Sequence, residues 1–323
     1  LDGDGDLELV FPLKVGETLQ ATSVVNSVYA LHHDGTYVEG YPAAPFPVSE
    51  LEAGVKLKTH TRFPILADDV DGDGEPELIL ATGGGNWNAS HVYLYVLEKN
   101  GDVKPGWPQM LTDQRPLPYR QLALIDRDRD GKKEILATVE EILTEQSPWG
   151  QETTFKLFKI DGQLSVEKSY SGLTYNEPRF QNQVADFDDD GIDEILAVTA
   201  VERENGQQRY EIVVMDGALQ PHLGWPRELP ITWPISVTDA DEDGYLEIMA
   251  GYVEQDRHQF VLIDRYGNTV PGYPRDLLIE SDTHFWDGSM FTVSQIDSAE
   301  TKVALASFNA STEGAVMNRA EHL

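Results

Sequence analysis

A nine-residue acidic pattern that recurs along the chain constrains its fold more than any other feature. The pattern is Asp-x-Asp-x-Asp-Gly-x-x-Glu, and an apolar stretch such as Leu78-Ile79-Leu80 follows it directly. Four complete copies occupy residues 69–77, 126–134, 186–194 and 239–247. A truncated copy opens the chain, and the third aspartates of the five copies are separated by 69, 57, 60 and 53 residues. A fixed motif at such intervals indicates a repeated structural unit.

A second element lies between the acidic loops. It consists of an apolar run, a turn containing glycine, and then Gly-aromatic-Pro. Its four copies are Gly40-Tyr41-Pro42, Gly106-Trp107-Pro108, Gly224-Trp225-Pro226 and Gly272-Tyr273-Pro274. The third unit keeps a turn at Asp161-Gly162 but lacks the aromatic-Pro part. Asp-Gly and Asn-Gly between strand-like runs predict β-hairpins, including one at Asp216-Gly217.

Each unit therefore reads as four short strands, with the acidic loop between the first and the second. First strands are expected at 121–125 and 235–238, and the fourth strand follows Gly-aromatic-Pro. A four-stranded repeat of this length is typical of a propeller blade, whereas repeats of sandwich domains are longer. We predict one all-β domain over 1–323, a β-propeller of about six visible blades, with seven in the full-length protein as the alternative. The expected blades are 1–60, 61–118, 119–178, 179–232, 233–287 and 288–323, the first and last incomplete.

The ends of the chain shape two further expectations. The first loop has lost its first aspartate because the chain begins at Leu1, so we expect the sequence to be a piece of a longer or processed protein. A degenerate sixth loop at 296–300 has lost its central aspartates and its glycine, so we expect no metal there.

The acidic loops have the chemistry of calcium sites. Calcium takes six to eight oxygen ligands at about 2.3–2.6 Å, and carboxylates at positions one, three and five of a curled loop can supply them. Glycine at position six permits a left-handed turn, the carbonyl at position seven can coordinate, and glutamate at position nine closes the shell. An EF-hand needs glutamate at position twelve, where this chain has Leu80, Ala137, Ala197 and Ala250. The remaining alternative is a set of Asp-Gly turns without metal.

We expect four to five calcium ions, each bound by its own set of predicted ligands. They are Asp2, Asp4 and Glu8; Asp69, Asp71, Asp73, Glu75 and Glu77; Asp126, Asp128, Asp130, Lys132 and Glu134; Asp186, Asp188, Asp190, Ile192 and Glu194; and Asp239, Asp241, Asp243, Tyr245 and Glu247.

The net charge supports a cation partner. The chain has 56 acidic and 24 basic residues, and 19 of the acids occupy the Asp and Glu positions of the motif, four in each complete copy and three in the first. Five calcium ions carry ten positive charges and would bring the net charge from −32 to −22. So acidic a chain argues against a nucleic-acid partner, which needs a basic face. No apolar run approaches the roughly 20 residues that a membrane helix needs, so no membrane insertion is expected.

The loops and the strands that follow them resemble the FG-GAP/VCBS repeat of integrin-α-like propellers. The Gly106-Trp107-Pro108 element is similar to that of bacterial secreted members. The resemblance implies calcium between the first two strands of a blade, a fold that is usually seven-bladed, and an extracellular adhesion or interaction role. The chain departs from the family in lacking clear Phe-Gly and Gly-Ala-Pro strings. The same loop motif also resembles that of rhamnogalacturonan lyases, which implies an enzyme as the alternative.

Outside the loops, the sequence offers one candidate ligand surface. No catalytic motif of a metalloprotease, serine hydrolase or nucleotide-binding protein is present. In a blade, the loops on the face opposite the acidic loops would carry aromatic and basic residues, a combination that suits a glycan or an acidic protein. These residues are Trp87, Trp149, Trp286, Arg62, Arg120 and Arg179. The alternative is that they are rim aromatics with local ion pairs, and His32-His33 is interpreted as part of a surface turn.

The expected function is a calcium-stabilised, non-catalytic binding, adhesion or scaffold module for a protein or carbohydrate ligand. Open loops of this kind need more calcium than the cytosol holds, so we expect an extracellular, cell-surface or periplasmic location. The alternatives are a polysaccharide-active enzyme of the lyase type and a structural subunit of a surface assembly.

Overall fold

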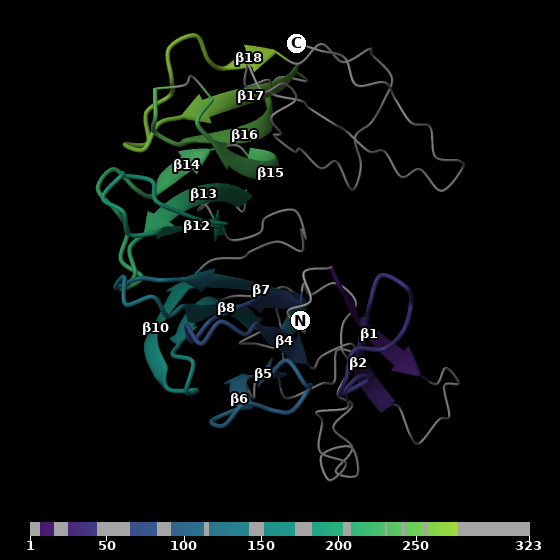
Figure 1. Ribbon diagram of the computed structural model, residues 1–323. Helices are drawn as coiled ribbons and strands as arrows, with labels where there is room; N and C mark the ends of the chain where they lie inside the picture. Colours follow the sequence, from purple (N-terminus) through teal and green to yellow (C-terminus); the bar gives the residue numbers. More distant parts are fainter. Residues whose placement is uncertain are drawn as a thin grey trace. The chain divides into compact units, whose positions relative to one another are not determined.

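The chain is all β in the part that its computed structural model describes, which is residues 7–15, 25–43, 65–82, 92–112, 116–141, 152–171, 183–202, 208–229, 231–240, 243–254 and 257–276. These residues contain eighteen strands in five antiparallel sheets and no α-helix (Figure 1). The predicted fold class, an all-β chain built from four-stranded propeller blades, is confirmed. In this described part, no helix has the length and apolar character needed to cross a bilayer.

The sheets follow the repeat, and we name them blades 1 to 5 in chain order. Blade 1 is a strand pair and the other four are four-stranded meanders in which each strand pairs with the next. The strands are β1 (Leu9–Val15) and β2 (Val25–Leu31) in blade 1; β3 (Leu66–Asp68), β4 (Glu77–Thr82), β5 (Val92–Leu97) and β6 (Gln109–Thr112) in blade 2; β7 (Pro116–Ile125), β8 (Glu134–Glu141), β9 (Glu152–Phe158) and β10 (Leu164–Ser171) in blade 3; β11 (Gln183–Ala185), β12 (Glu194–Glu202), β13 (Gln208–Met215) and β14 (Arg227–Leu229) in blade 4; and β15 (Ile231–Thr238), β16 (Glu247–Glu254), β17 (Arg257–Ile263) and β18 (Arg275–Asp276) in blade 5.

The chain consists of two compact units, Leu1–Asn176 with blades 1 to 3 and Glu177–Leu323 with blades 4 and 5. The prediction of one domain with six blades therefore stays a prediction. Its sixth blade, 288–323, and the degenerate loop at 296–300 lie outside the described residues.

The inner strands are buried on both faces, which explains why the sequence after each acidic loop is continuously apolar. In β4, Leu78 and Leu80 pack with blade 1, whereas Ile79 between them packs with blade 3. Successive side chains of a strand point to opposite faces, so both sides of blade 2 are covered by neighbouring sheets. Unbroken apolar runs are expected for strands in that position.

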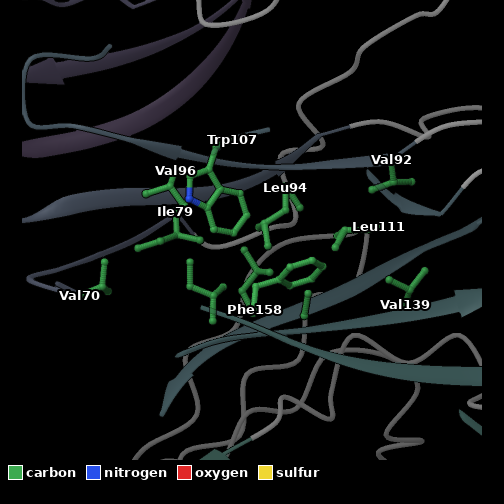
Figure 2. Close-up of a cluster of buried hydrophobic side chains, with 13 residues drawn as sticks. Val70, Ile79, Val92, Leu94, Val96, Trp107, Leu111, Val139 and Phe158 are labelled. Atoms are coloured by element: carbon green, nitrogen blue, oxygen red, sulfur yellow. The ribbon is translucent and has the colours of Figure 1, made fainter. Parts of the chain in front are cut away.

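Within each unit, neighbouring sheets share an apolar core. In the core between blades 2 and 3, Val92, Leu94 and Val96 of β5 meet Val139 of β8 and Phe158 of β9 (Figure 2). Blades 4 and 5 share a second core, which includes Leu196, Ile212, Ile248 and Val261.

The turn that follows the third strand of each four-stranded blade, and β2 in blade 1, has one recurring form, which we call the C–D turn. It spans five residues, and the fourth has positive φ, as in Gly35, Gly101, Gly162 and Gly267. The predicted glycine hairpins are confirmed there. In blade 4 the turn is Asp216–Gln220, and Leu219 (φ 58°) takes this place instead of Gly217. The hairpin predicted at Asp216-Gly217 is therefore confirmed, and its left-handed residue is Leu219, because the turn needs that conformation at its fourth position and not at its second.

The Gly-aromatic-Pro element joins each blade to the next within a unit. A Cβ on Gly106 would lie 2.1 Å from the carbonyl oxygen of Asp161, in the C–D turn of the following blade. Trp107 is 7% exposed, and its Nε1 donates to the Ile160 carbonyl oxygen at 2.7 Å. Only glycine allows such a close approach of two backbones.

The joint is repeated elsewhere in the same geometry. A Cβ on Gly40 would meet the Asn100 carbonyl oxygen at 1.9 Å, and one on Gly224 would meet that of Tyr266 at 2.5 Å. Trp225 Nε1 donates to the Arg265 carbonyl oxygen at 3.1 Å. Blade 3, which lacks this element in sequence, is the last blade of the first unit. The element therefore holds neighbouring blades together, a role that its sequence alone did not reveal.

Candidate metal centres

Each acidic loop connects the first two strands of a four-stranded blade, as the repeat predicted. The closing pairs of the hairpins are Asp68 with Glu77, Ile125 with Glu134, Ala185 with Glu194 and Thr238 with Glu247. The ninth residue of the loop is thus the first residue of the second strand. Strands flank all four loops, which confirms that they are not EF-hands, since those need flanking helices.

The first aspartate folds the loop around its own carboxylate. Its Oδ2 accepts the backbone N–H of the glycine at position six, at 2.9 Å in the loop 69–77 and 2.7 Å in the loop 186–194. The same bond is 3.1 Å long in the loops 126–134 and 239–247. These glycines have φ between 80° and 91°, which confirms the predicted left-handed turn; they are Gly74, Gly131, Gly191 and Gly244.

The aspartate at position five organises the second half of the loop. Its Oδ1 accepts the N–H of position seven at 2.7–2.9 Å in all four loops, for example from Ile192 to Asp190. Such local side-chain to backbone bonds are a usual property of aspartate in turns. Coordination by the carbonyl groups of Glu75, Lys132, Ile192 and Tyr245 stays a prediction.

The glutamate at position nine is buried, with 1–7% exposure in the four loops. One of its oxygens, Oε2, accepts the N–H of position two, at 2.8 Å from Phe187 to Glu194 and 2.7 Å from Ala240 to Glu247. A buried carboxylate needs compensation, so this glutamate is positioned to meet a cation.

Burial and the neighbouring acids disturb these carboxyls. Burial raises the pKa of Glu194 to about 7, and the charges of Asp188, Asp190 and Asp186 push it the same way, against the hydrogen bond from Phe187. Burial also raises the pKa of Glu77 and Glu134, which Lys104 and Arg127 oppose. The loops therefore hold more negative charge than their own donors balance.

The acidic groups converge closely enough to share one ion. Carboxylate oxygens lie within 4.8 Å of one another in each of three sets, Asp69, Asp71 and Glu77; Asp126, Asp128 and Asp130; and Asp186, Asp188 and Asp190. In the loop 126–134, the buried Oδ1 of Asp126 accepts no hydrogen bond. Hard oxygen donors around an unsatisfied buried oxygen fit a calcium ion. Asp239 and Asp243 are described in the loop 239–247, but Asp241 between them lies outside the described residues.

In three of the loops, a cationic or basic side chain lies beside a carboxylate of the motif, and sequence reasoning missed all three contacts. Lys104 Nζ lies 2.9 Å from Asp71 Oδ2 and 2.8 Å from Glu77 Oε1, which places a positive charge between these carboxylates. Arg127 Nε lies 3.4 Å from Glu134 Oε1, and His222 Nε2 lies 3.8 Å from Asp188 Oδ2. Lys104 and His222 both follow a C–D turn, so only the fold brings them to the loop.

Several other predicted site residues lie outside the description. Those are Asp2, Asp4, Trp87, Trp149, Trp286, Arg62 and Arg179. Arg120 lies in β7 opposite Val139 of β8, and its side chain is not described. Glu8 is described, and its Oε1 lies 4.0 Å from His32 Nδ1.

Comparison with known proteins supports the repeat. Residues 69–137 match the family model of an FG-GAP-like repeat, a stretch that runs from the loop of blade 2 into the second strand of blade 3. The resemblance drawn from the loops is thereby confirmed for this segment. No curated protein matches the chain.

Three solved structures are similar to this chain over most of its length. The chain is similar to the rhamnogalacturonan lyase YesW, with 16% identity and a TM-score of 0.47 over 82% of this chain and 55% of that one. The exotype rhamnogalacturonan lyase YesX has 16% identity and a TM-score of 0.47 over 81% of this chain and 53% of that one. The Bacillus licheniformis rhamnogalacturonan lyase PL11 has 15% identity and a TM-score of 0.44 over 82% of this chain and 64% of that one. The chain spans about half the length of the first two enzymes.

Proposed function

We propose that the chain is a calcium-stabilised propeller module that works outside the cytosol and binds a protein or a glycan. The single observation that carries the calcium part is the loop 126–134, where three aspartates converge and the buried Oδ1 of Asp126 has no hydrogen-bond donor. The other complete loops repeat the same hydrogen-bond frame. An ion that binds the folded loops and not the unfolded chain stabilises the fold by mass action.

Calcium suits these loops better than magnesium. Each offers several carboxylate oxygens on one short turn, whereas magnesium prefers strict octahedral geometry and keeps several waters. The dependence on a high calcium concentration that open loops of this kind show supports an extracellular, surface or periplasmic setting.

Calorimetric titration of metal-free protein with calcium tests the proposal. We expect four to five ions per chain, with a lower melting temperature after chelation. The variant Asp126→Asn keeps the shape of the side chain but removes a charge, so it should lose one equivalent of calcium. Asp161→Asn, in the C–D turn of the same blade, is the matched control and should lose none. An unchanged melting curve in chelator, on protein shown beforehand to be metal-loaded, would contradict the proposal.

The ligand surface proposed from the sequence needs its own test. Binding to a glycan array, repeated with Trp87→Ala and Arg120→Ala, should show loss of signal if the aromatic and basic residues form the site. Retained binding by both variants would remove that surface. An assay for unsaturated products on pectic substrates separates a lyase from a binding module.

A further inference from the structure

One position recurs in four blades with the same backbone hydrogen bond, and in blades 2 and 4 its side chain lies beside the acidic loop. It lies two residues before the glycine of Gly-aromatic-Pro, and its backbone N–H donates to the third strand. The bonds run from Val38 to Ala30, Lys104 to Val96, His222 to Val214 and Val270 to Leu262, at 2.8–3.1 Å. Because the backbone is held in the same way, the four side chains are equivalent. We call this the facing position.

The facing position reaches the same two carboxylates in blades 2 and 4. Lys104 contacts Asp71 at position three of its loop and Glu77 at position nine. His222 lies beside Asp188 and Glu194, which hold the same two positions in the loop 186–194. The lysine brings its own positive charge, whereas a neutral imidazole brings a nitrogen lone pair. The two blades therefore present different sites from the same frame.

We propose that Asp188, Glu194 and His222 form a binding site for a transition-metal ion of the zinc type, which competes with calcium for the loop 186–194 because the two ions share Asp188 and Glu194. This inference rests on the proposed function in so far as both require the loops to hold cations. One donor atom from each of the three residues lies within 4.8 Å of the other two. Three protein ligands with an open fourth position are an arrangement that zinc accepts.

The donor set decides the type of ion. Calcium takes oxygen ligands, whereas imidazole suits zinc, copper, iron and nickel. The hydrogen bond from Phe187 N holds Oε2 of Glu194 at 2.8 Å, so Oε1 is oriented for the metal by a neighbouring donor. The side chains of Asp188 and His222 are 35% and 30% exposed, which leaves an entry path.

In the described part of the chain, the arginine that approaches this site does not contact its carboxylates. Arg265 approaches the same loop, but its Nη1 meets the backbone carbonyl oxygen of Asp188, not the carboxylate. Its charge lies 3.5 Å above the Tyr245 ring. Asp188 and Glu194 therefore face the imidazole, while the corresponding carboxylates in blade 2 face an ammonium group.

Two variants test the site within the full chain, free of any histidine tag. His222→Val installs the residue that blades 1 and 5 carry at the facing position, so the turn has a natural precedent. Lys104→His transfers the imidazole to blade 2. We expect zinc affinity to fall at least ~10-fold in His222→Val, since even outer partners of a ligand contribute 10–100-fold. Lys104→His should gain one further zinc equivalent.

Copper(II) electron paramagnetic resonance gives a second readout. A nitrogen hyperfine pattern is expected in the wild type, lost in His222→Val and increased in Lys104→His. Equal zinc affinity and equal spectra for wild type and His222→Val would overturn the inference. Calcium titration of the same samples keeps the two proposals apart. Loss of zinc binding with calcium retained supports the inference, and zinc binding without any calcium binding would refute only the calcium function.

Discussion

Each four-stranded blade has two turns at its loop end that contain acidic or amide side chains, and the two are completed in different ways. The C–D turn of blade 4 is finished by its own backbone, because Asp216 Oδ1 accepts the N–H groups of Ala218 and Gln220 at 2.9 and 2.8 Å. The acidic loop of the same blade has four carboxylates, those of Asp186, Asp188, Asp190 and Glu194. They accept from the backbone N–H groups of Phe187, Asp190, Gly191 and Ile192, which is one donor per charge against two for Asp216.

The pKa values of one carboxyl group from each kind of turn, Asp34 and Glu194, shift in opposite directions. Hydrogen bonds from Thr36 lower the pKa of Asp34 in the C–D turn of blade 1. Burial raises the pKa of Glu194 to about 7 in the acidic loop of blade 4. The first turn stabilises its charge with the protein alone, and the second leaves charge for an external cation. The comparison shows that an Asp-Gly sequence does not by itself indicate a metal site; the number of charges per donor does.

The largest expected effect concerns the contact between the tryptophan of one blade and the C–D turn of the next. Trp107→Ala should destabilise the chain by about 3–5 kcal/mol, because it removes a buried ring from the core between blades 2 and 3 and leaves the Ile160 carbonyl without its donor. Urea unfolding measures the loss. It should be the same with calcium and with chelator, and Tyr37→Ala, at an exposed site, should change little. A loss of stability that depended on calcium would contradict the view that only the acidic loop serves a cation.

The next effect is a pH dependence of the metal-free protein. The folded pKa of Glu194 is about 7 and the ordinary value is 4.5. A raised folded pKa means that the protonated form is favoured by folding, so this stability is complete below about pH 4.5 and is lost as the pH rises through 7. The loss should reach up to about 3 kcal/mol.

Glu194→Gln tests that dependence directly. The amide can still accept from Phe187 but carries no charge, so in chelator the variant should be more stable than the wild type at pH 8 and equal to it at pH 4. In calcium it should be less stable at pH 8. Thermal unfolding across pH in both conditions checks this, and a wild-type protein with a flat pH profile in chelator would contradict it.

Lys104 provides a third test, because it supplies a cation to one acidic loop. Its ammonium contacts Asp71, Glu77 and Glu98, and its side chain is 12% exposed. Lys104→Met should destabilise metal-free protein by about 2 kcal/mol, since a hydrogen bond to a charged group contributes about 1.5–3 kcal/mol. Calcium should restore part of the loss. Equal losses with and without calcium would show that this loop does not exchange its lysine for an ion.

The smallest effect is expected in the C–D turn itself. Asp216→Ala removes two hydrogen bonds to backbone N–H groups on an exposed turn. The loss should be about 1 kcal/mol, and it should be independent of calcium. Chemical denaturation with and without chelator measures both quantities, and calcium-dependent loss would mean that this aspartate also serves an ion.

Much of this architecture could be predicted from the sequence, because it depends on local chemistry. The spacing of the acidic loops, the glycine at position six and the apolar run after each loop fixed the strand order of blades 2 to 5. The left-handed conformation of Gly74 and its three counterparts followed from the same pattern.

The rest depended on which segments meet in space. Nothing near Lys104 or His222 in sequence indicates an acidic loop, since the partners lie 27 to 34 residues away, as for Lys104 with Glu77 and His222 with Asp188. The role of Trp107 likewise required knowing that its blade packs against the turn that contains Ile160. Leu219 shows the local limit, because a buried leucine adopts the conformation for which the sequence offered Gly217.

The joint made by Gly-aromatic-Pro also bears on how such a chain can evolve. Its glycine and its indole ring contact backbone carbonyl oxygens of the next blade, and every residue has such an oxygen. A gene segment that encodes one blade can therefore be duplicated in tandem or exchanged without changes to the side chains of the neighbouring blade. Positions next to the joint can then change without disturbing it. The facing position is Val38, Lys104, His222 and Val270 in four blades, and such changes let one blade acquire a chemistry that the others lack.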